Sequence, residues 1–128
     1  EYALLLPENP DLSAENLKNK LDIAFDCDVG VLITDSHNRP WRMGTIGGAI
    51  GCAGFQVIDD RRGLSDLFGR ELKVTLINRA DAISGLATLL MGETTEKTPV
   101  ALVRGFPVDS EFGTASDINR PIEEDLFQ

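Results

Sequence analysis

Hydrophobic residues recur at helical spacing near the start of the chain. Between residues 11 and 25 the apolar positions follow one another at i, i+4, i+7 and i+8, and polar residues occupy the positions between them. This spacing predicts an amphipathic helix. Asp11 or Ser13 would cap its first turn, because either side chain can accept a hydrogen bond from a free backbone amide. The apolar stripe of this helix would be Leu17, Leu21, Ala24 and Phe25.

A second helix is predicted between Asn78 and Gly92. Asparagine is a favoured residue at the start of a helix, and glycine is a favoured residue just past its end. The hydrophobic residues between these two positions again repeat at helical spacing, at Ala80, Ile83, Ala87 and Leu90. We therefore expect two main helices in the chain.

The remaining apolar segments are short and predict strands. Residues 2–7, 29–34 and 99–103 are apolar runs, and 71–77 alternates between apolar and polar positions. Residues 45–55 are apolar but interrupted by glycines, each of which would cost a helix about 1 kcal/mol. Residues 45–55 therefore favour an extended layer packed closely against another backbone. Residues 59–68 are polar and predict a turn. The expected fold is α+β, with a mixed layered sheet and two main helices.

Composition narrows the classes of function. The chain has 128 residues and a net charge of −9, which suits a single domain, or part of one, but not a nucleic-acid partner. No apolar run approaches the roughly 20 residues of a membrane-spanning helix, so no membrane association is expected. Cys27 and Cys52 are too few and too far apart for a disulfide framework or a zinc knuckle. Two such cysteines are typical of a reducing compartment, and we expect a cytoplasmic protein.

Asp35 is the first residue of interest for chemistry. It stands at the end of an apolar run, and the turn after it contains two arginines, the only histidine and the only tryptophan. Three interpretations remain open. Asp35 could cap the turn through the backbone, pair with Arg39 or Arg42, or bind a hard cation together with Ser36. The single histidine, His37, is too little to predict a Ser–His–Asp or Cys–His nucleophile.

Glu93 is the second such residue, directly after the predicted helix end. The carboxyl end of a helix is its negative pole, so a glutamate there is either fully exposed or close to a bound cation. Thr94 and Thr95 add hydroxyl groups to the same loop. Arg42, like Arg39 and Arg104, is a candidate for binding phosphate or carboxylate, or else a surface residue or ion-pair partner. Trp41 would be a core or interface anchor.

Seven segments together resemble the coenzyme F-420:glutamate ligase family, the GTP-dependent gamma-glutamyl ligases of deazaflavin biosynthesis. The segments run in the order of the family and extend from one end of the chain to the other. They correspond to the C-terminal half of the family's domain, so residues 1–128 would be one domain, a gamma-glutamyl ligase-like half-domain. The segments are Leu4-Leu-Leu-Pro-Glu-Asn-Pro-Asp11, Thr34-Asp-Ser-His-Asn-Arg-Pro-Trp-Arg42, Gly48-Ala-Ile-Gly-Cys-Ala-Gly54, Asp66-Leu-Phe-Gly69, Leu90-Met-Gly-Glu93, Pro99-Val-Ala-Leu-Val-Arg-Gly105 and Arg120-Pro-Ile-Glu-Glu-Asp-Leu-Phe127.

The resemblance implies an activity and a set of site residues. The family adds L-glutamate in gamma linkage to a phosphorylated deazaflavin precursor, with GTP as co-substrate and Mg²⁺ or Mn²⁺ as the metal. By resemblance, Asp35, Ser36 and Glu93 would contact metal, and Met91, Gly92, Glu93, Thr94 and Thr95 would contact nucleotide. Serine stands at 36 where the family usually has threonine, and glutamate at 93 where it often has glutamine. The resemblance names no catalytic residue, and it implies a homodimer.

The missing half of the domain leaves other functions open. A chain without the family's first nucleotide-binding segment is expected to be incomplete as an enzyme. One alternative is therefore a non-catalytic dimerisation or nucleotide-binding module of the same fold. Another is a related amino-acid ligase that acts on a different acidic substrate.

Overall fold

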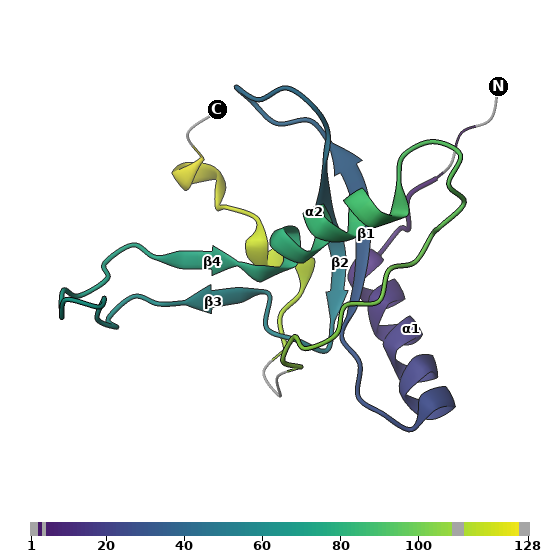
Figure 1. Ribbon diagram of the computed structural model, residues 1–128, viewed down its shortest axis with the longest axis horizontal. Helices are drawn as coiled ribbons and strands as arrows, with labels where there is room; N and C mark the ends of the chain where they lie inside the picture. The colour runs from purple at the N-terminus through teal and green to yellow at the C-terminus, as the bar shows by residue number, and fades with distance from the viewer. Residues whose placement is uncertain (1–2, 4, 109–111, 126–128) are drawn as a thin grey trace.

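The computed structural model describes residues 3, 5–108 and 112–125, and it confirms a mixed α+β fold (Figure 1). Two helices pack with two antiparallel strand pairs, β1–β2 and β3–β4. Among the described residues, no helix has the length and apolar content that a bilayer crossing requires. In chain order the elements are α1 (Pro10–Phe25), β1 (Val31–His37), β2 (Ile46–Ala53), β3 (Ile58–Asp60), β4 (Leu76–Asn78), α2 (Arg79–Met91) and the 3₁₀ turns η1 (Ala115–Ile118) and η2 (Ile122–Glu124).

Helix α1 begins at least two residues earlier than predicted. Asn9 is its N-cap, and the Oδ1 atom of Asn9 accepts a hydrogen bond of 2.9 Å from the amide of Leu12. Pro10 follows at the first helical position, where its fixed φ suits a helix and its missing N–H is not needed. The predicted capping role of Asp11 or Ser13 is therefore wrong. Asp11 instead uses its carboxylate for contacts outside the helix, described below.

The buried face of α1 also differs from the predicted stripe. Ala14 is fully buried, whereas Leu17 is exposed and Phe25 is 70 % exposed. Leu21 is the predicted stripe residue that packs, against a cluster formed by Ala14, Val31 and Ala53. The side of α1 that packs against the hairpin therefore carries Ala14 and Leu21, whereas Leu17 and Phe25 are exposed.

Helix α2 follows the prediction more closely. Asn78 caps it by accepting a hydrogen bond of 3.0 Å from the amide of Asp81, and Gly92 ends it with a φ of +79°. Its buried residues are Ala80, Ser84 and Ala87, whereas Leu90 is exposed. The helix thus presents small residues to the sheet, like α1.

The β1–β2 hairpin lies between the two helices and carries a bulge (Figure 1). Ile33 pairs with Gly51 but Thr34 pairs with Ala49, so Ile50 is an extra residue in β2. A bulge shifts the alternation of side chains along a strand by one position. As a result Ala49 and Cys52 both face the cluster on the α2 side, while Ala53 packs with α1.

Two glycines of β2 allow both helices to approach it. A Cβ atom at Gly47 would lie 2.6 Å from the carbonyl oxygen of Ser84 in α2. One at Gly51 would lie 2.5 Å from the carbonyl carbon of Pro10 in α1. The predicted glycine-rich layer is therefore confirmed, and its neighbours are the backbones of the two helices.

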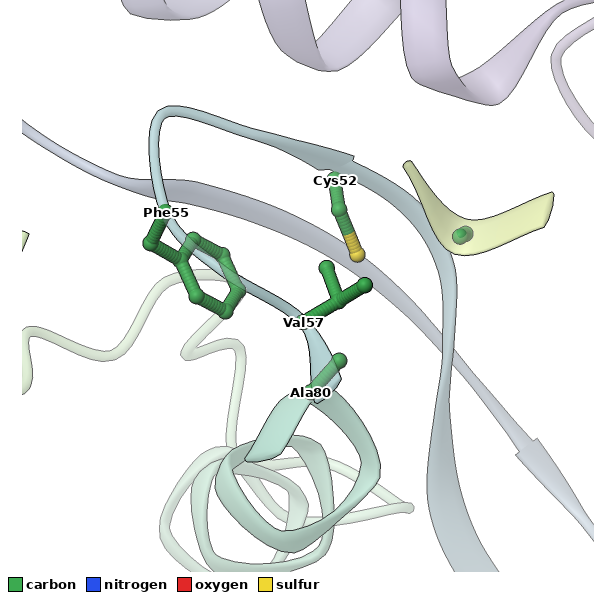
Figure 2. Close-up of a cluster of buried hydrophobic side chains, with 5 residues drawn as sticks. Cys52, Phe55, Val57 and Ala80 are labelled. Atoms are coloured by element: carbon green, nitrogen blue, oxygen red, sulfur yellow. The ribbon is translucent and has the colours of Figure 1, made fainter. Parts of the chain in front are cut away.

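The larger core cluster joins β2 to α2 and to η1. Cys52, Phe55, Val57 and Ala80 point toward one another in Figure 2, and Ala115 completes the cluster. The ring of Phe55 also meets the ring of Phe106 edge to face, with 6.1 Å between centroids. Burial raises the pKa of the Cys52 thiol to about 12, with further contributions from Asp11, Asp81 and Asp117.

Strands β3 and β4 form an arm that projects from the rest of the molecule (Figure 1). The predicted polar turn at 59–68 overlaps β3, and the strand predicted at 71–77 is regular only over Leu76–Asn78. The alternation of apolar and polar residues in 71–77 does not bury its apolar positions at Val74 and Leu76, which are exposed. The arm has no second layer over it within the described part of the chain, so alternation alone did not bury one face.

Two further strand predictions are not met. Residues 99–103 form no strand, and Val100 and Leu102 are exposed. In the opening segment, residues 3 and 5–7 form no strand either, and Tyr2 and Leu4 lie outside the described residues. Both segments lack a neighbouring strand in the described chain to pair with, and an apolar run needs such a partner to become a strand.

Candidate functional site

Asp35 lies inside β1, two residues before its end, rather than at the end of the strand as predicted. It pairs with Gly48 of β2, and its side chain is exposed. The Oδ1 atom accepts a hydrogen bond of 2.9 Å from the amide of Ser36. This contact joins two neighbouring residues of β1, so it is not the predicted cap of the turn that follows the strand.

Ser36 connects this strand to the last turns of α2. It pairs with Gly47, the glycine that packs against Ser84 and Thr88. Helix α2 and the β1–β2 hairpin together form a layer, called here the α2–hairpin layer. Since Thr88 is four residues before Gly92, the end of β1 and the loop after α2 lie at the same end of this layer (Figure 1). The structure thus brings the two predicted segments, 35–36 and 91–95, into one region of the molecule.

The predicted metal ligands Asp35, Ser36 and Glu93 do not form a cluster in this structure. Successive residues of a strand point to opposite faces, so Asp35 and Ser36 are directed differently. In residues 3, 5–108 and 112–125, no group of three or more histidine, cysteine, aspartate or glutamate side chains is placed to hold a metal ion. Asp35, Ser36 and Glu93 therefore stay predictions as metal contacts.

The loop after α2 is organised by an acid that sequence reasoning missed. Glu93 is exposed. It is Glu96 whose carboxylate accepts a hydrogen bond of 2.8 Å from the amide of Thr94 and bonds from the Thr94 hydroxyl. The available signal was the pairing of a threonine with an acid two residues later in a short loop, a spacing that allows local side-chain caps.

The two arginines and the tryptophan of the 38–45 turn are exposed to solvent. Arg39 and Arg42 are exposed, and Trp41 is 92 % exposed with a φ of +63°. The core interpretation of Trp41 is therefore wrong. Arg104 is exposed as well, and Nδ1 of His37 lies 3.0 Å from the carbonyl oxygen of Asn38. These exposed groups are available to a ligand, but the described residues do not gather them into a pocket.

Two clefts lie elsewhere and were not predicted. One, of about 430 Å³, is lined by Arg61, Arg79 and Phe106 among others, and the guanidinium of Arg79 stacks 4.5 Å from the Phe106 ring centroid. The other, of about 490 Å³, lies along the first turns of α1. Asp11 is beside it and fixes the local backbone, because its carboxylate accepts hydrogen bonds from the amides of Cys52 (2.9 Å) and Ala115 (2.8 Å).

Comparison of the amino-acid sequence with known proteins identifies the family of this chain. A sequence model described as F420-0:Gamma-glutamyl ligase matches residues 1–105. The protein named Coenzyme F420:L-glutamate ligase of Methanocaldococcus jannaschii is 44 % identical over 124 residues, which are 97 % of this chain and 50 % of that protein.

Two further relatives carry the same name. The one from Archaeoglobus fulgidus is 43 % identical over 129 aligned positions, covering 100 % of this chain and 51 % of that protein. The one from Methanopyrus kandleri is 46 % identical over 110 residues, covering 86 % and 44 %. The chain thus spans about half the length of the curated relatives it matches. With a family match over most of its residues and this level of identity, the chain belongs to the F420-0:gamma-glutamyl ligase family.

Proposed function

We propose that this chain supplies a metal- and nucleotide-binding part of a GTP-dependent ligase that joins L-glutamate, in gamma linkage, to a phosphorylated deazaflavin precursor. The single observation that carries the proposal is the 44 % identity to a coenzyme F420:L-glutamate ligase along nearly the whole chain. The structure adds support, because segments 35–36 and 91–95, far apart in sequence, lie at one end of the α2–hairpin layer.

The proposed reaction needs an activated carboxyl group. The precursor's carboxylate attacks the γ-phosphorus of GTP, an acyl phosphate forms and GDP leaves. The amine of glutamate then attacks the acyl carbon, phosphate leaves, and the amine loses a proton as the amide forms. Most of the negative charge in these steps is on phosphate oxygens, so the site must position and neutralise them.

The donor atoms present are of the right kind for this task. Asp35 and Glu93 offer exposed carboxylate oxygens and Ser36 a hydroxyl, and Mg²⁺ or Mn²⁺ prefers oxygen ligands of these types. When bound, such an ion supplies charge neutralisation at the nucleotide's phosphates. In this proposal Asp35, Ser36 and Glu93 each contact divalent metal, Asp35 and Ser36 from opposite faces of β1, while the backbone from Met91 to Thr95 and the guanidinium of Arg42 contact the nucleotide.

A titration tests this assignment. GTP is added to the chain in the presence of Mn²⁺ and followed by calorimetry, in the wild type and in Asp35→Ala and Glu93→Ala. Asp28→Ala is the matched control, because Asp28 is also an exposed carboxylate but lies between α1 and β1. We expect weaker binding in the first two variants only. Equal binding in all four proteins would refute the site.

Self-association is a second part of the proposal, favoured by the apolar surface of the arm. Leu67 and Phe68 at its tip are 93 % and 88 % exposed, and Val74 is also exposed. Exposed apolar groups gathered on a projecting element are typical of an interface. This surface also fits the alternative of a dimerisation module without catalysis. Sedimentation of the wild type measures whether the chain forms a dimer, and the titration with GTP and Mn²⁺ measures nucleotide binding. A dimer that binds no GTP would favour the non-catalytic module over the ligase.

A further inference from the structure

The imidazole ring of His37, the last residue of β1, is oriented by a backbone contact although the residue is exposed. Its Nδ1 atom lies 3.0 Å from the carbonyl oxygen of Asn38. A carbonyl oxygen can only accept a hydrogen bond, so Nδ1 carries the ring proton in this contact. The lone pair of the neutral imidazole is then on Nε2. Histidines that bind a metal ion through one ring nitrogen typically donate the other N–H in this way.

The Nε2 atom of His37 lies over β2 at Gly48. A Cβ atom at Gly48 would be 2.8 Å from Nε2 and 2.9 Å from Cδ2 of the His37 ring. The ring therefore leans from the end of β1 across the neighbouring strand and fills the space that a side chain at position 48 would take. Gly48 is also the residue that pairs with Asp35. The nitrogen with the lone pair thus lies beside the Asp35–Gly48 pair.

Asp35 and His37 are on the same face of β1. Side chains two residues apart in a strand point to the same side, and the pairing from Thr34 to His37 is regular because the bulge lies before Thr34. Residues directly opposite in antiparallel strands have Cβ positions about 4.5–5.5 Å apart. The exposed carboxylate of Asp35 and the Nε2 atom of His37 therefore flank one point, the Cβ position of Gly48. A single ion close to this point is within reach of both side chains.

The charge around Nε2 also favours a cation. The Oδ1 atom of Asp81, in the first turn of α2, would lie 3.8 Å from the same Cβ position of Gly48. This atom accepts a hydrogen bond of 2.9 Å from the amide of Ala49, which fixes the carboxylate in place. Within residues 3, 5–108 and 112–125 no third histidine, cysteine or acid completes a set of ligands. Water and phosphate oxygens would therefore supply the remaining ligands, as they commonly do for divalent ions at nucleotide sites.

We propose that His37, through Nε2, and Asp35 are joint ligands of one divalent ion on this face of β1, and that the imidazole makes the site prefer a transition-metal ion such as Mn²⁺ to Mg²⁺. Imidazole suits transition metals, whereas Mg²⁺ is bound by oxygen ligands. The inference rests on the proposed function, because it concerns the ion that Asp35 contacts there. Ser36 points to the other face of the strand and is not part of this pair.

The experiment measures the binding of Mn²⁺, Ni²⁺ and Mg²⁺ to the full chain by calorimetry, without nucleotide. We expect His37→Ala and Asp35→Ala each to weaken Mn²⁺ and Ni²⁺ binding by about 10-fold or more, since even the outer partners of metal ligands contribute that much. Mg²⁺ binding should weaken in Asp35→Ala but change by less than about 2-fold in His37→Ala, because Mg²⁺ gains little from imidazole. Asp28→Ala is the control, an exposed carboxylate outside the site, and should bind all three ions like the wild type.

A second measurement identifies the binding atom. Because His37 is the only histidine of the chain, its two ring nitrogens give NMR signals that need no further assignment. Addition of Zn²⁺, which is not redox-active and also binds imidazole, should shift the Nε2 signal strongly, while Nδ1 keeps its proton and shifts less. Circular dichroism of each variant shows whether the fold is retained, so that a loss of binding is not mistaken for unfolding.

Three results would overturn the inference. The first is a folded His37→Ala variant that binds Mn²⁺ and Ni²⁺ as tightly as the wild type. The second is a Zn²⁺ shift at Nδ1 rather than at Nε2. The third is an Asp35→Ala variant that binds Mn²⁺ and Ni²⁺ like the wild type, because the histidine would then bind the ion without its proposed partner.

A parallel titration with GTP and Mn²⁺ separates this inference from the proposed function. If His37→Ala binds Mn²⁺ and GTP like the wild type while Asp35→Ala binds them more weakly, the role of His37 is refuted and the proposed function stands. If Mn²⁺ binding depends on both His37 and Asp35 but GTP binds to none of the proteins, the metal pair stands and the proposed function fails.

Discussion

Replacing Gly51 by alanine should destabilise the whole fold, because β2 has no space for a methyl group there. The new Cβ atom would lie 2.5 Å from the carbonyl carbon and 2.8 Å from the Cβ of Pro10. Carbon atoms normally approach to about 3.5–4.0 Å, so strand and helix would have to separate by about 1 Å. Overpacking costs about 1–3 kcal/mol. We expect the upper part of this range, about 2–3 kcal/mol, because the obstructing atoms belong to the first residue of a helix and cannot rotate away.

Urea denaturation followed by circular dichroism measures this change, with Gly85→Ala as the control. Gly85 is also in close contact, but a Cβ atom there would meet the flexible side chain of Ile46 at 3.3 Å. Alanine in place of a helical glycine gains up to about 1 kcal/mol in helix propensity. We therefore expect Gly85→Ala to be neutral or stabilising. If Gly51→Ala left the free energy of unfolding within about 0.5 kcal/mol of the wild type, the close packing of α1 on β2 would be refuted.

Two further predictions concern buried polar groups. Asp11→Ala should lower the free energy of unfolding by about 2–4 kcal/mol, because the part-buried amides of Cys52 and Ala115 lose their acceptor. Denaturation measures this loss, and hydrogen exchange at the Ala115 amide should become faster. Unchanged exchange at that amide would argue against the contact. Cys52 should not react with a thiol reagent at pH 8 in the folded chain, whereas the exposed Cys27 should, because burial raises the pKa of the Cys52 thiol to about 12. The folded state then keeps a thiol proton that the unfolded state loses near pH 9. The free energy of unfolding of the wild type should therefore fall as the pH rises from 9 toward 12, and that of Cys52→Ala should fall less. An equal decline in both proteins would contradict the raised pKa of Cys52.

The candidate site was predictable in part. The chain pattern marked Asp35 and Glu93 as chemistry-bearing acids, and the structure brings their segments to the same end of the α2–hairpin layer. Glu96, the acid that organises the loop, accepts hydrogen bonds from the amide and the hydroxyl of Thr94. It was missed because a threonine two residues before an acid is a common spacing that does not by itself predict this contact. Asp11 was interpreted as a helix cap, a plausible local role. Its actual partners at Cys52 and Ala115 are 41 and 104 residues away along the chain.

By itself the sequence determined where α2 begins and ends and where the close-packed strand lies. Asn78 and Gly92 bound α2 through hydrogen bonds and dihedral angles that involve only nearby residues. The glycines of β2 likewise reveal a close approach, because no other residue leaves that space. Only the tertiary structure decided which face of α1 is buried, where the bulge at Ile50 shifts the alternation, and why residues 99–103 pair with nothing in the described chain. These features depend on which surface lies opposite, and periodicity along one segment carries no information about a partner that is distant in sequence.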